Sequence, residues 1–188
     1  MKVYVIRHGE SENNLKGLWT GWQDAPLTEK GQEDAQKAGD FLKQVSFDKI
    51  YTSDLVRAMK TAEIAVPGCS YEASPLLREI NVGTLANQPY SVLTEQQRER
   101  ISRQGYAEFS GETYTDFYGR IHALRKELEA LACETVALFS HAGWLRGMLD
   151  TVLDMHVPRK NVCCNNCVIG IFEYANDVWK LHSWINLT

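Results

Sequence analysis

Two histidines, each placed just after a short apolar run, are the residues of this chain best suited to chemistry. His8 follows the run 3–6 and His141 follows the run 136–139, with one residue between in each case. Such runs predict buried strands of an α/β sheet, whose ligands bind beyond the carboxyl ends of the strands. If the two strands are neighbours, both imidazoles face one pocket, which Arg7 makes positive. Two imidazoles and a guanidinium suit a phosphate group.

Arg57 adds a second guanidinium to this predicted edge of the sheet. It follows a predicted strand at 49–52 and lies early in the next helix, for which we expect Ser53 to be the N-cap. Helical side chains lean toward the N-terminus of their helix, and that terminus favours anions, so Arg57 can reach the same pocket. The alternative is an exposed arginine paired with Asp54 or Glu63, since most arginines are surface groups.

The alternation of strand and helix patterns predicts an α/β fold. We expect a mostly parallel central sheet with helices on both faces and an antiparallel edge strand. Strands are predicted at 2–7, 49–52, 71–73, 135–139, 168–174 and 178–185, and helices at 28–45, 53–62, 93–103, 117–131 and 142–153. A long polar loop follows the first strand, and long ordered loops are often functional. At 188 residues the chain is predicted to form a single domain over 1–188.

Composition narrows the class of partner. The chain is 44% hydrophobic and 23% charged, as is ordinary for a globular protein, and its net charge of −4 does not favour nucleic acid. No apolar run approaches the roughly 20 residues of a membrane span, and no signal peptide is recognised. The five cysteines form no repeated framework, which favours the cytoplasm. The expected partner is therefore a small phosphorylated substrate, and the oligomeric state stays open.

Several short motifs occur in a consistent order along most of the chain. They are Arg7-His8-Gly9-Glu10-Ser11, Asn14, residues 20–31, residues 52–58, Leu77-Arg78-Glu79 with Gly83, Gly111-Glu112-Thr113, and Ser140-His141-Ala142-Gly143. Together they resemble the motifs of the histidine phosphatase superfamily, which includes the cofactor-dependent phosphoglycerate mutases. The resemblance implies the phosphoglycerate mutase-like fold and a phosphomonoesterase of the histidine acid phosphatase type, with no cofactor and no metal.

The resemblance also implies a role for individual residues. His8 would be the nucleophile that becomes phosphohistidine, and Glu79 would be the proton donor and later the base. The phosphoryl oxygens would be held by Arg7, Arg57 and His141, and substrate or phosphate would contact Asn14, Thr20, Gly21 and Ala142. Physical reasoning agrees, because covalent catalysis divides the hydrolysis into two easier displacements and fixed cations stabilise the charged transition state. Neighbouring arginines should oppose protonation of His8 and keep it nucleophilic.

Within this family the chain departs from the mutases near Glu79. Where they carry an arginine and a tyrosine that grip the substrate carboxylate, this chain has Ile80 and Val82, and residues 85–87 replace a Trp-Glu-Gly common in phosphatases. We therefore expect a hydrolase acting on a small phosphorylated metabolite. The substrate stays open between a sugar phosphate, α-ribazole phosphate, phosphoglycerate and a phosphoprotein, and a cofactor-dependent phosphoglycerate mutase is the alternative within the family.

The same residues also allow interpretations other than an enzyme of this family. Each histidine alone could be a buried structural residue, and Glu79 could be a surface carboxylate beside Arg78. Trp19, Trp22 and Trp144 are candidates for the pocket wall, although packing would explain them equally well. A non-catalytic phosphate-binding module is disfavoured because every position needed for chemistry is filled.

A zinc-dependent deaminase is the most distinct alternative. The cysteines Cys163, Cys164 and Cys167 contain a C-x-x-C pattern, and residues 8–10 have the pattern H-x-E, as in zinc deaminases. However, Pro158 is not adjacent to the cysteines, and the two halves lie at opposite ends of the sequence. The cysteines also lead into a predicted strand, where small buried thiols are common. Their role stays open.

Overall fold

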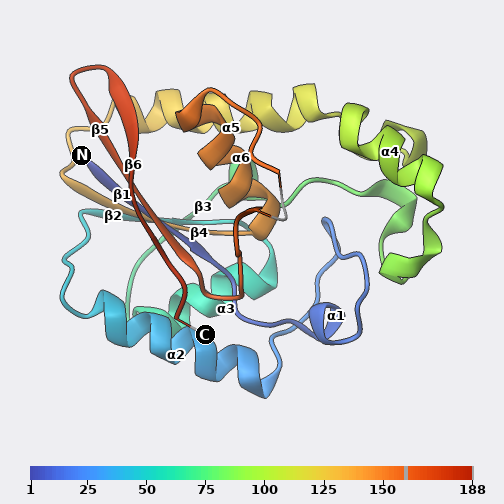
Figure 1. Ribbon diagram of the computed structural model, residues 1–188. Helices are drawn as coiled ribbons and strands as arrows, with labels where there is room; N and C mark the ends of the chain where they lie inside the picture. The colour runs from blue at the N-terminus through green and yellow to red at the C-terminus, as the bar shows by residue number, and fades with distance from the viewer. Residues whose placement is uncertain (159–160, 188) are drawn as a thin grey trace.

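The computed structural model, which describes residues 1–158 and 161–187, is a six-stranded sheet with helices on both faces (Figure 1). Its strands are β1 (Lys2–Arg7), β2 (Lys49–Thr52), β3 (Glu72–Ala73), β4 (Thr135–Ser140), β5 (Ile169–Ala175) and β6 (Val178–Ile185). They lie in the order β3-β2-β4-β1-β5-β6, with the first four parallel. β5 pairs antiparallel with β1, and β6 pairs antiparallel with β5. The predicted mostly parallel sheet with an antiparallel side is confirmed.

The helices match the predicted series, with short additions in the loops. They are α1 (Glu12–Leu15), α2 (Glu29–Leu42), α3 (Val56–Ala65), α4 (Glu95–Gln104), α5 (Tyr114–Glu129) and α6 (Ala142–Leu153), with 3₁₀ turns η1 (Pro75–Leu77), η2 (Gly83–Leu85), η3 (Tyr90–Val92) and η4 (Ala107–Phe109). Among the helices of the described residues, none is long and apolar enough to cross a membrane.

Helix caps decide where two of these helices begin. Thr28 caps α2 as predicted, since its hydroxyl accepts a hydrogen bond of 2.9 Å from the amide of Gly31. The prediction that Ser53 caps the next helix is wrong, because the N-cap of α3 is Leu55, which has no side-chain cap. The hydroxyl of Ser53 instead lies 2.9 Å from Nε2 of His141 and accepts a long bond of 3.3 Å from the Leu55 amide.

The central strands distribute their apolar side chains between two cores. In β1, Val3 and Val5 pack in the core beneath α5 and α6, whereas Ile6 packs in the other core with α2 and α3. β4 alternates in the same way, because successive side chains of a strand point to opposite faces. Figure 1 shows α5 and α6 above the sheet and α2 and α3 below it. A strand buried on both faces gives the continuous apolar run that the sequence showed.

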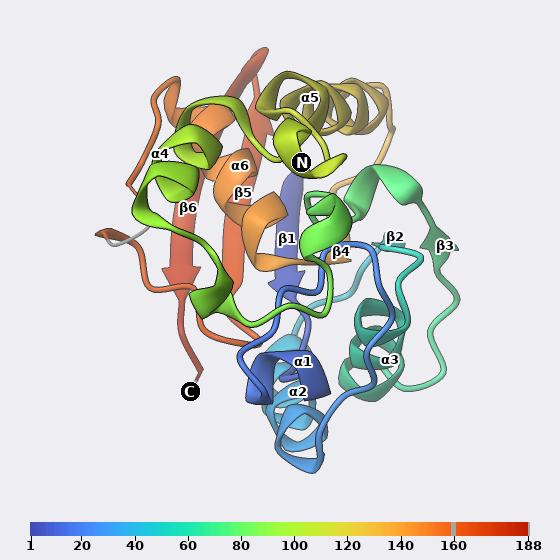
Figure 2. The same cartoon turned by 90° about the vertical axis from the view of Figure 1, so that its right-hand side faces the viewer.

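Parallel pairing brings the segments after β1, β2 and β4 to one edge of the sheet. β1 lies between β4 and β5 (Figure 2), with Arg7 in register with Ser140. The amide of His8 donates to the carbonyl of Ser140 at 2.9 Å, and the amide of Ser53 donates to the carbonyl of Phe139 at 2.8 Å. The backbone therefore fixes the start of each loop that carries a candidate residue.

Two glycines allow the loop after β1 to pack tightly against the start of α2. A Cβ added at Gly9 would lie 2.2 Å from the carbonyl oxygen of Gly31, and one added at Gly31 would lie 2.0 Å from that of Glu10. Both contacts are backbone contacts that cannot relax easily. The loop beside His8 therefore packs directly against the start of α2.

Candidate active site

A cavity of about 330 Å³ opens at the carboxyl edge of the sheet. Eight of the residues predicted from the sequence line it: Arg7, His8, Asn14, Thr20, Gly21, Arg57, Glu79 and Ala142. His141 is fully buried beside His8, with 5.1 Å between the ring centroids. The structure thus brings every predicted site residue to one place, from segments that are far apart in the sequence.

The surroundings of His8 determine which ring nitrogen carries the hydrogen. Nδ1 lies 2.7 Å from the carbonyl oxygen of Gly9, and Nε of Arg57 lies 3.3 Å from Nε2. Because the carbonyl can only accept, Nδ1 is assigned the hydrogen, and the lone pair of Nε2 accepts a hydrogen bond from Nε of Arg57. Burial, followed by the charges of Arg57 and Arg7, lowers the pKa of His8 well below its ordinary value. His8 is therefore neutral near pH 7, with Nε2 as a potential nucleophile.

Arg57 is a buried cation rather than a surface residue. It is 1% exposed, and its two terminal nitrogens donate to the carbonyls of Gln23 and Gly21, both at 2.8 Å. Burial lowers the pKa of Arg57 to about 10, which still leaves it protonated near neutral pH. The surface alternative is wrong, because Asp54 and Glu63 pair with other cations.

Several residues at the cavity have a buried nitrogen without a hydrogen-bond partner among the described residues, Trp19 and Arg146 among them. Two of these nitrogens belong to residues next to His8: Nδ1 of His141 and Nε of Arg7. The other ring nitrogen of His141 contacts Ser53, and Arg7 donates from its terminal nitrogen to the carbonyl of Cys164. Burial, followed by the charge of Arg57, lowers the pKa of His141 well below its ordinary value. Unpaired buried nitrogens are costly, so these two fit a ligand rich in acceptor oxygens.

Glu79 reaches the cavity from the loop between η1 and η2. Its Oε1 accepts from the amide of Ile80 at 2.9 Å, and its Oε2 accepts from the amide of Gly143 at 3.0 Å. A Cβ at Gly143 would lie 2.1 Å from Oε1 of Glu79, so this close approach requires glycine. The carboxylate is thereby held against the first turn of α6 rather than free on the surface.

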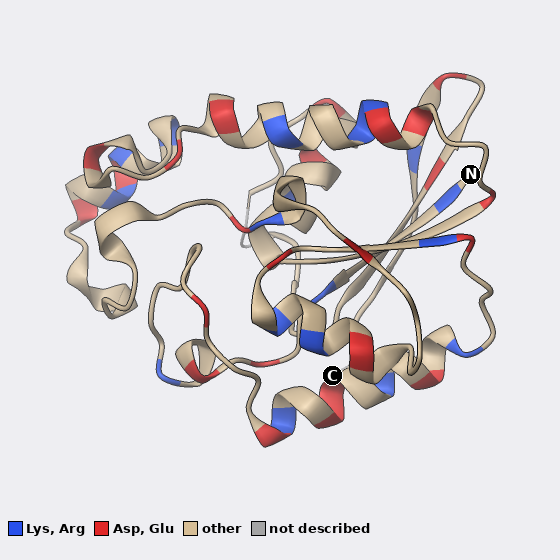
Figure 3. Ribbon diagram, turned by 180° about the vertical axis from the view of Figure 1, so that it is seen from behind, with Lys and Arg blue, Asp and Glu red and all other residues tan. Residues whose placement is uncertain are grey.

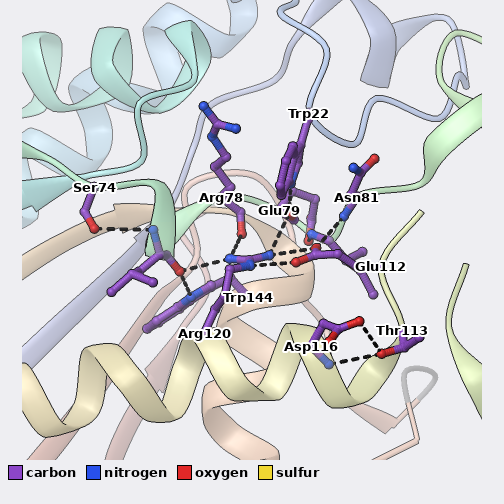
Figure 4. A network of polar contacts seen from close by, with 12 residues as sticks. Trp22, Ser74, Arg78, Glu79, Asn81, Glu112, Thr113, Asp116, Arg120 and Trp144 are labelled. Carbon is purple, nitrogen blue, oxygen red and sulfur yellow. Dashed lines mark hydrogen bonds and ion pairs between the residues drawn. The ribbon is translucent and has the colours of Figure 1, made fainter. Parts of the chain in front are cut away.

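The three tryptophans considered for the pocket wall differ in position. Trp19 lines the cavity, but Trp22 and Trp144 do not. Their indole nitrogens donate to the carbonyls of Glu79 at 2.7 Å and Leu76 at 2.8 Å, in the segment that carries the carboxylate (Figure 4). Of the two alternatives, the structure favours packing for Trp22 and Trp144 and a place in the cavity wall for Trp19.

Sequence reasoning missed several residues that line the cavity. Arg146 lies one helical turn beyond Ala142 on α6, and the leaning of helical side chains toward the N-terminus would have indicated it. Tyr90 and Tyr106 come from η3 and from the segment before η4, which carry no periodic signal. Trp19 contacts both tyrosine rings edge-on, with centroids 5.1 and 5.7 Å apart.

The cavity is positively charged although the chain as a whole is not. Three arginines and one glutamate line the cavity, although the whole chain carries a net charge of −4. Elsewhere both signs are interspersed, as along α2 and α5 in Figure 3. Among the ion pairs of residues 1–158 and 161–187, none engages the cavity arginines Arg7, Arg57 or Arg146. An anion in the cavity would therefore meet arginines that form no ion pair with a protein carboxylate.

The cysteine segment lies beside His8 despite its distance in sequence. Asn166 donates from its side chain to the carbonyl of His8 at 3.1 Å, and Cys164 and Cys167 are buried with free thiols. Burial raises the pKa of the Cys167 thiol to about 12. Within the described part of the chain, no three His, Cys, Asp or Glu side chains are grouped to hold a metal ion. The positions of these residues give the zinc alternative no support.

Comparison with known proteins finds similarity over nearly the whole chain. The family model described as "Histidine phosphatase superfamily (branch 1)" matches residues 3–187. A protein of Yersinia pestis (strain Pestoides F) named "Probable phosphoglycerate mutase GpmB" is 32% identical over 195 residues, which cover 98% of this chain and 90% of that protein.

Solved structures with this fold carry names of two activities. A "putative alpha-ribazole-5'-P phosphatase" from Escherichia coli K-12 superposes with a TM-score of 0.86 at 25% identity, covering 100% of this chain and 97% of that one. A phosphoglycerate mutase from Thermus thermophilus superposes with a TM-score of 0.77 at 27% identity, covering 100% of both chains. Similarity of fold therefore does not choose between the two activities.

Proposed function

This chain belongs to the histidine phosphatase superfamily (branch 1), and we propose that it hydrolyses small phosphomonoesters through a phosphohistidine formed on His8. The observation that carries the proposal is the state of His8, which is buried and neutral, with its Nε2 lone pair beside Arg57. A neutral imidazole among cations is suited to attack a phosphoryl group, because the cations attract the anion and the lone pair of Nε2 is released once Arg57 donates its Nε–H to a phosphoryl oxygen instead.

The first half-reaction forms a bond between Nε2 of His8 and phosphorus and breaks the ester P–O bond. Arg7, Arg57 and His141 hold the non-bridging oxygens, and the unpaired Nε of Arg7 and Nδ1 of His141 support this assignment. Protonated Glu79 gives its proton to the departing oxygen, so an alcohol leaves. Charge that spreads over the phosphoryl oxygens in the transition state is stabilised by donors already in place.

The second half-reaction releases inorganic phosphate. The carboxylate of Glu79 now takes a proton from a water molecule whose oxygen attacks phosphorus, and the bond to Nε2 of His8 breaks. The lone pair returns to His8 and the proton is back on Glu79, so the enzyme is ready for another turnover. The same residue acts first as acid and then as base, as microscopic reversibility allows.

Five other lining residues have largely aromatic or aliphatic side chains, which favour a leaving group with an apolar surface. We define the leaving-group wall as the lining residues Trp19, Ile80, Val82, Tyr90 and Tyr106. Ile80 and Val82 are 4% and 2% exposed. Both side chains are aliphatic, so neither offers a polar contact to a substrate carboxylate. This wall supports a hydrolase of small phosphorylated metabolites.

Mutase activity is the second candidate, because a relative and a solved structure bear that name. Ile80 and Val82 oppose it, since a mutase of phosphoglycerate must also grip a carboxylate. With 3-phosphoglycerate and a bisphosphoglycerate primer, we expect ³¹P NMR to detect release of inorganic phosphate and negligible isomerisation. Efficient interconversion of the two phosphoglycerates would replace hydrolysis as the proposed function.

A chemical trap tests the central step of the proposal. Rapid acid-free quenching of the enzyme with ³²P-labelled p-nitrophenyl phosphate should capture one acid-labile phosphate per active chain. Peptide mapping should locate the label on His8. A label on another residue would contradict the assignment of the nucleophile, and turnover without any trapped phosphate would contradict the covalent mechanism.

A further inference from the structure

An ion pair behind the loop that carries Glu79 has no place in the proposed reaction (Figure 4). Nε and one terminal nitrogen of Arg120, on α5, donate to the two carboxylate oxygens of Glu112 at 2.7 and 2.8 Å. The two side chains are only 16% and 12% exposed. Glu112 belongs to one of the short motifs of the sequence, and Arg120 to none of them.

Arg120 contacts the loop backbone at three carbonyls on the N-terminal side of the carboxylate. It donates to the carbonyls of Leu76 at 3.0 Å, Arg78 at 3.1 Å and Glu79 at 3.2 Å. A planar guanidinium has a fixed fork of donors, so one rigid group can hold several acceptors in a defined geometry. The guanidinium therefore fixes the backbone of the loop up to and including Glu79.

Glu112 holds the same loop on the other side of Glu79. Its Oε2 accepts from the amide of Asn81 at 2.7 Å, and its own amide donates to the carbonyl of Asn81 at 2.9 Å. The loop is thus bonded to the pair both before and after the residue that carries the carboxylate. Figure 4 shows these contacts on the side of the loop where α5 lies.

The peptide group between Glu79 and Ile80 links this pair to the carboxylate. Its carbonyl accepts from Arg120 and from the indole of Trp22, while its N–H donates to Oε1 of Glu79 at 2.9 Å. A peptide group is planar, so a donor that fixes the carbonyl also fixes the direction of the N–H. A cationic donor on the carbonyl also polarises the group and strengthens the N–H as a donor. The orientation of the carboxylate thus depends on Arg120.

We propose that Arg120 and Glu112 are positioning residues that aim the carboxyl group of Glu79 at the leaving-group oxygen. The proposal rests on the role of Glu79 in the proposed function. A buried ion pair adds little net stability compared with a well-packed apolar pair, so stability alone gives a weak reason for this arrangement. A proton donor, in contrast, must lie within hydrogen-bond reach of a defined atom, and small displacements are costly.

The test measures how the effect of Arg120→Met depends on the leaving group. A poor leaving group such as the alkoxide of ethyl phosphate needs the proton, whereas p-nitrophenolate leaves without it. We expect the single-turnover rate of phosphoenzyme formation to fall about 10²-fold with ethyl phosphate, as for a misplaced catalytic group. With p-nitrophenyl phosphate the rate should change by less than about threefold, and in a Glu79→Gln background the substitution should add little for either substrate.

Milder variants and a matched control make the test robust. If Arg120→Met does not fold, Arg120→Lys and Glu112→Gln can replace it. We expect both to slow the reaction of ethyl phosphate more than that of p-nitrophenyl phosphate, to a smaller degree than Arg120→Met. Arg125→Met is the control, since Arg125 lies on the same helix and donates to the carbonyl of Thr151 at 3.1 Å, away from the site. We expect it to leave the ratio of the two rates unchanged.

The outcomes separate this inference from the proposed function. Equal slowing of both substrates by Arg120→Met, or an undiminished effect in the Glu79→Gln background, would make the pair merely structural and overturn the inference. In both cases a phosphate trapped on His8 would leave the proposed hydrolysis standing. If no phosphoenzyme forms with either substrate in the unmodified chain, the proposed function itself is wrong.

Discussion

Two sets of cavity residues, the group around His8 (called the phosphate end below) and the leaving-group wall, are built in different ways. At the phosphate end, His8, Arg57 and His141 follow strands of the sheet or begin helices, and backbone bonds of β1 and β4 fix where they start. The leaving-group wall comes from loops and 3₁₀ turns. There, Trp19 exchanges backbone bonds with Gln88 at 2.9 Å and Asn87 at 2.7 Å, so two loops hold each other. His8, Arg57 and His141 are thus positioned by the sheet and its helices, whereas Glu79 and the leaving-group wall are positioned by contacts between loops.

Removing His8, the proposed nucleophile, should lower activity more than any other change at the cavity. His8→Ala should lower kcat/KM for p-nitrophenyl phosphate by on the order of 10⁶-fold, as loss of a covalent nucleophile does elsewhere. The control is His182→Ala, because His182 is exposed on β6 and outside the cavity. Retention of more than a small fraction of the activity in His8→Ala would place the chemistry on a different residue.

Glu79→Gln should slow phosphoenzyme formation by an amount that depends on the basicity of the leaving group. General acid catalysis contributes about 10²–10⁴-fold, so phosphoenzyme formation from ethyl phosphate should slow by that order. Formation from p-nitrophenyl phosphate should slow much less. Single-turnover kinetics are needed, because the proposed mechanism also has Glu79 activate water in the second step. Equal slowing of both substrates would remove Glu79 from the reacting groups.

The phosphate end should also give the protein an acid-sensitive stability. Burial keeps His8 and His141 neutral in the folded chain, while the unfolded chain protonates both near their ordinary pKa of 6.5. The free energy of unfolding should therefore fall as the pH falls below about 6.5, by up to about 1.4 kcal/mol per pH unit for each histidine. Urea unfolding between pH 7.5 and 5, without phosphate, measures this slope. His141→Gln should flatten it, and an unchanged slope would contradict the argument.

Trp19→Leu should give the smallest effect, confined to the choice of leaving group. Benzyl and ethyl phosphates release alkoxides of similar basicity but differ in apolar surface. Loss of an aromatic contact worth about 0.5–1.5 kcal/mol should lower the preference for benzyl over ethyl phosphate by roughly two- to tenfold. Trp184→Leu is the control, because Trp184 lies on β6 away from the cavity. An unchanged preference in Trp19→Leu would mean that the leaving group lies elsewhere.

The contrast also explains what the sequence could and could not predict. His8 and His141 were predictable because an apolar run followed by a polar residue marks a strand end, and parallel strands end at one edge. Glu79 was indicated only by the family resemblance, since its loop has no periodic pattern. Tyr90 and Tyr106 reach the cavity through contacts between distant loops, which no local pattern encodes. Ser53 was misassigned because a hydroxyl just before a helix can serve a neighbouring side chain instead of the helix.

The contact between Asn166 and the carbonyl of His8 has a consequence for the synthesis of the chain. The two residues are 158 positions apart, and the amide of Arg7 also donates to the carbonyl of Val168 at 3.0 Å. At about 5–20 residues per second, a ribosome needs roughly 8–30 s to cover that distance. Throughout this interval β1 lacks its neighbour β5, and the nucleophile lacks part of its surroundings. Nascent chains should therefore stay inactive until Asn166 and β5 have been made.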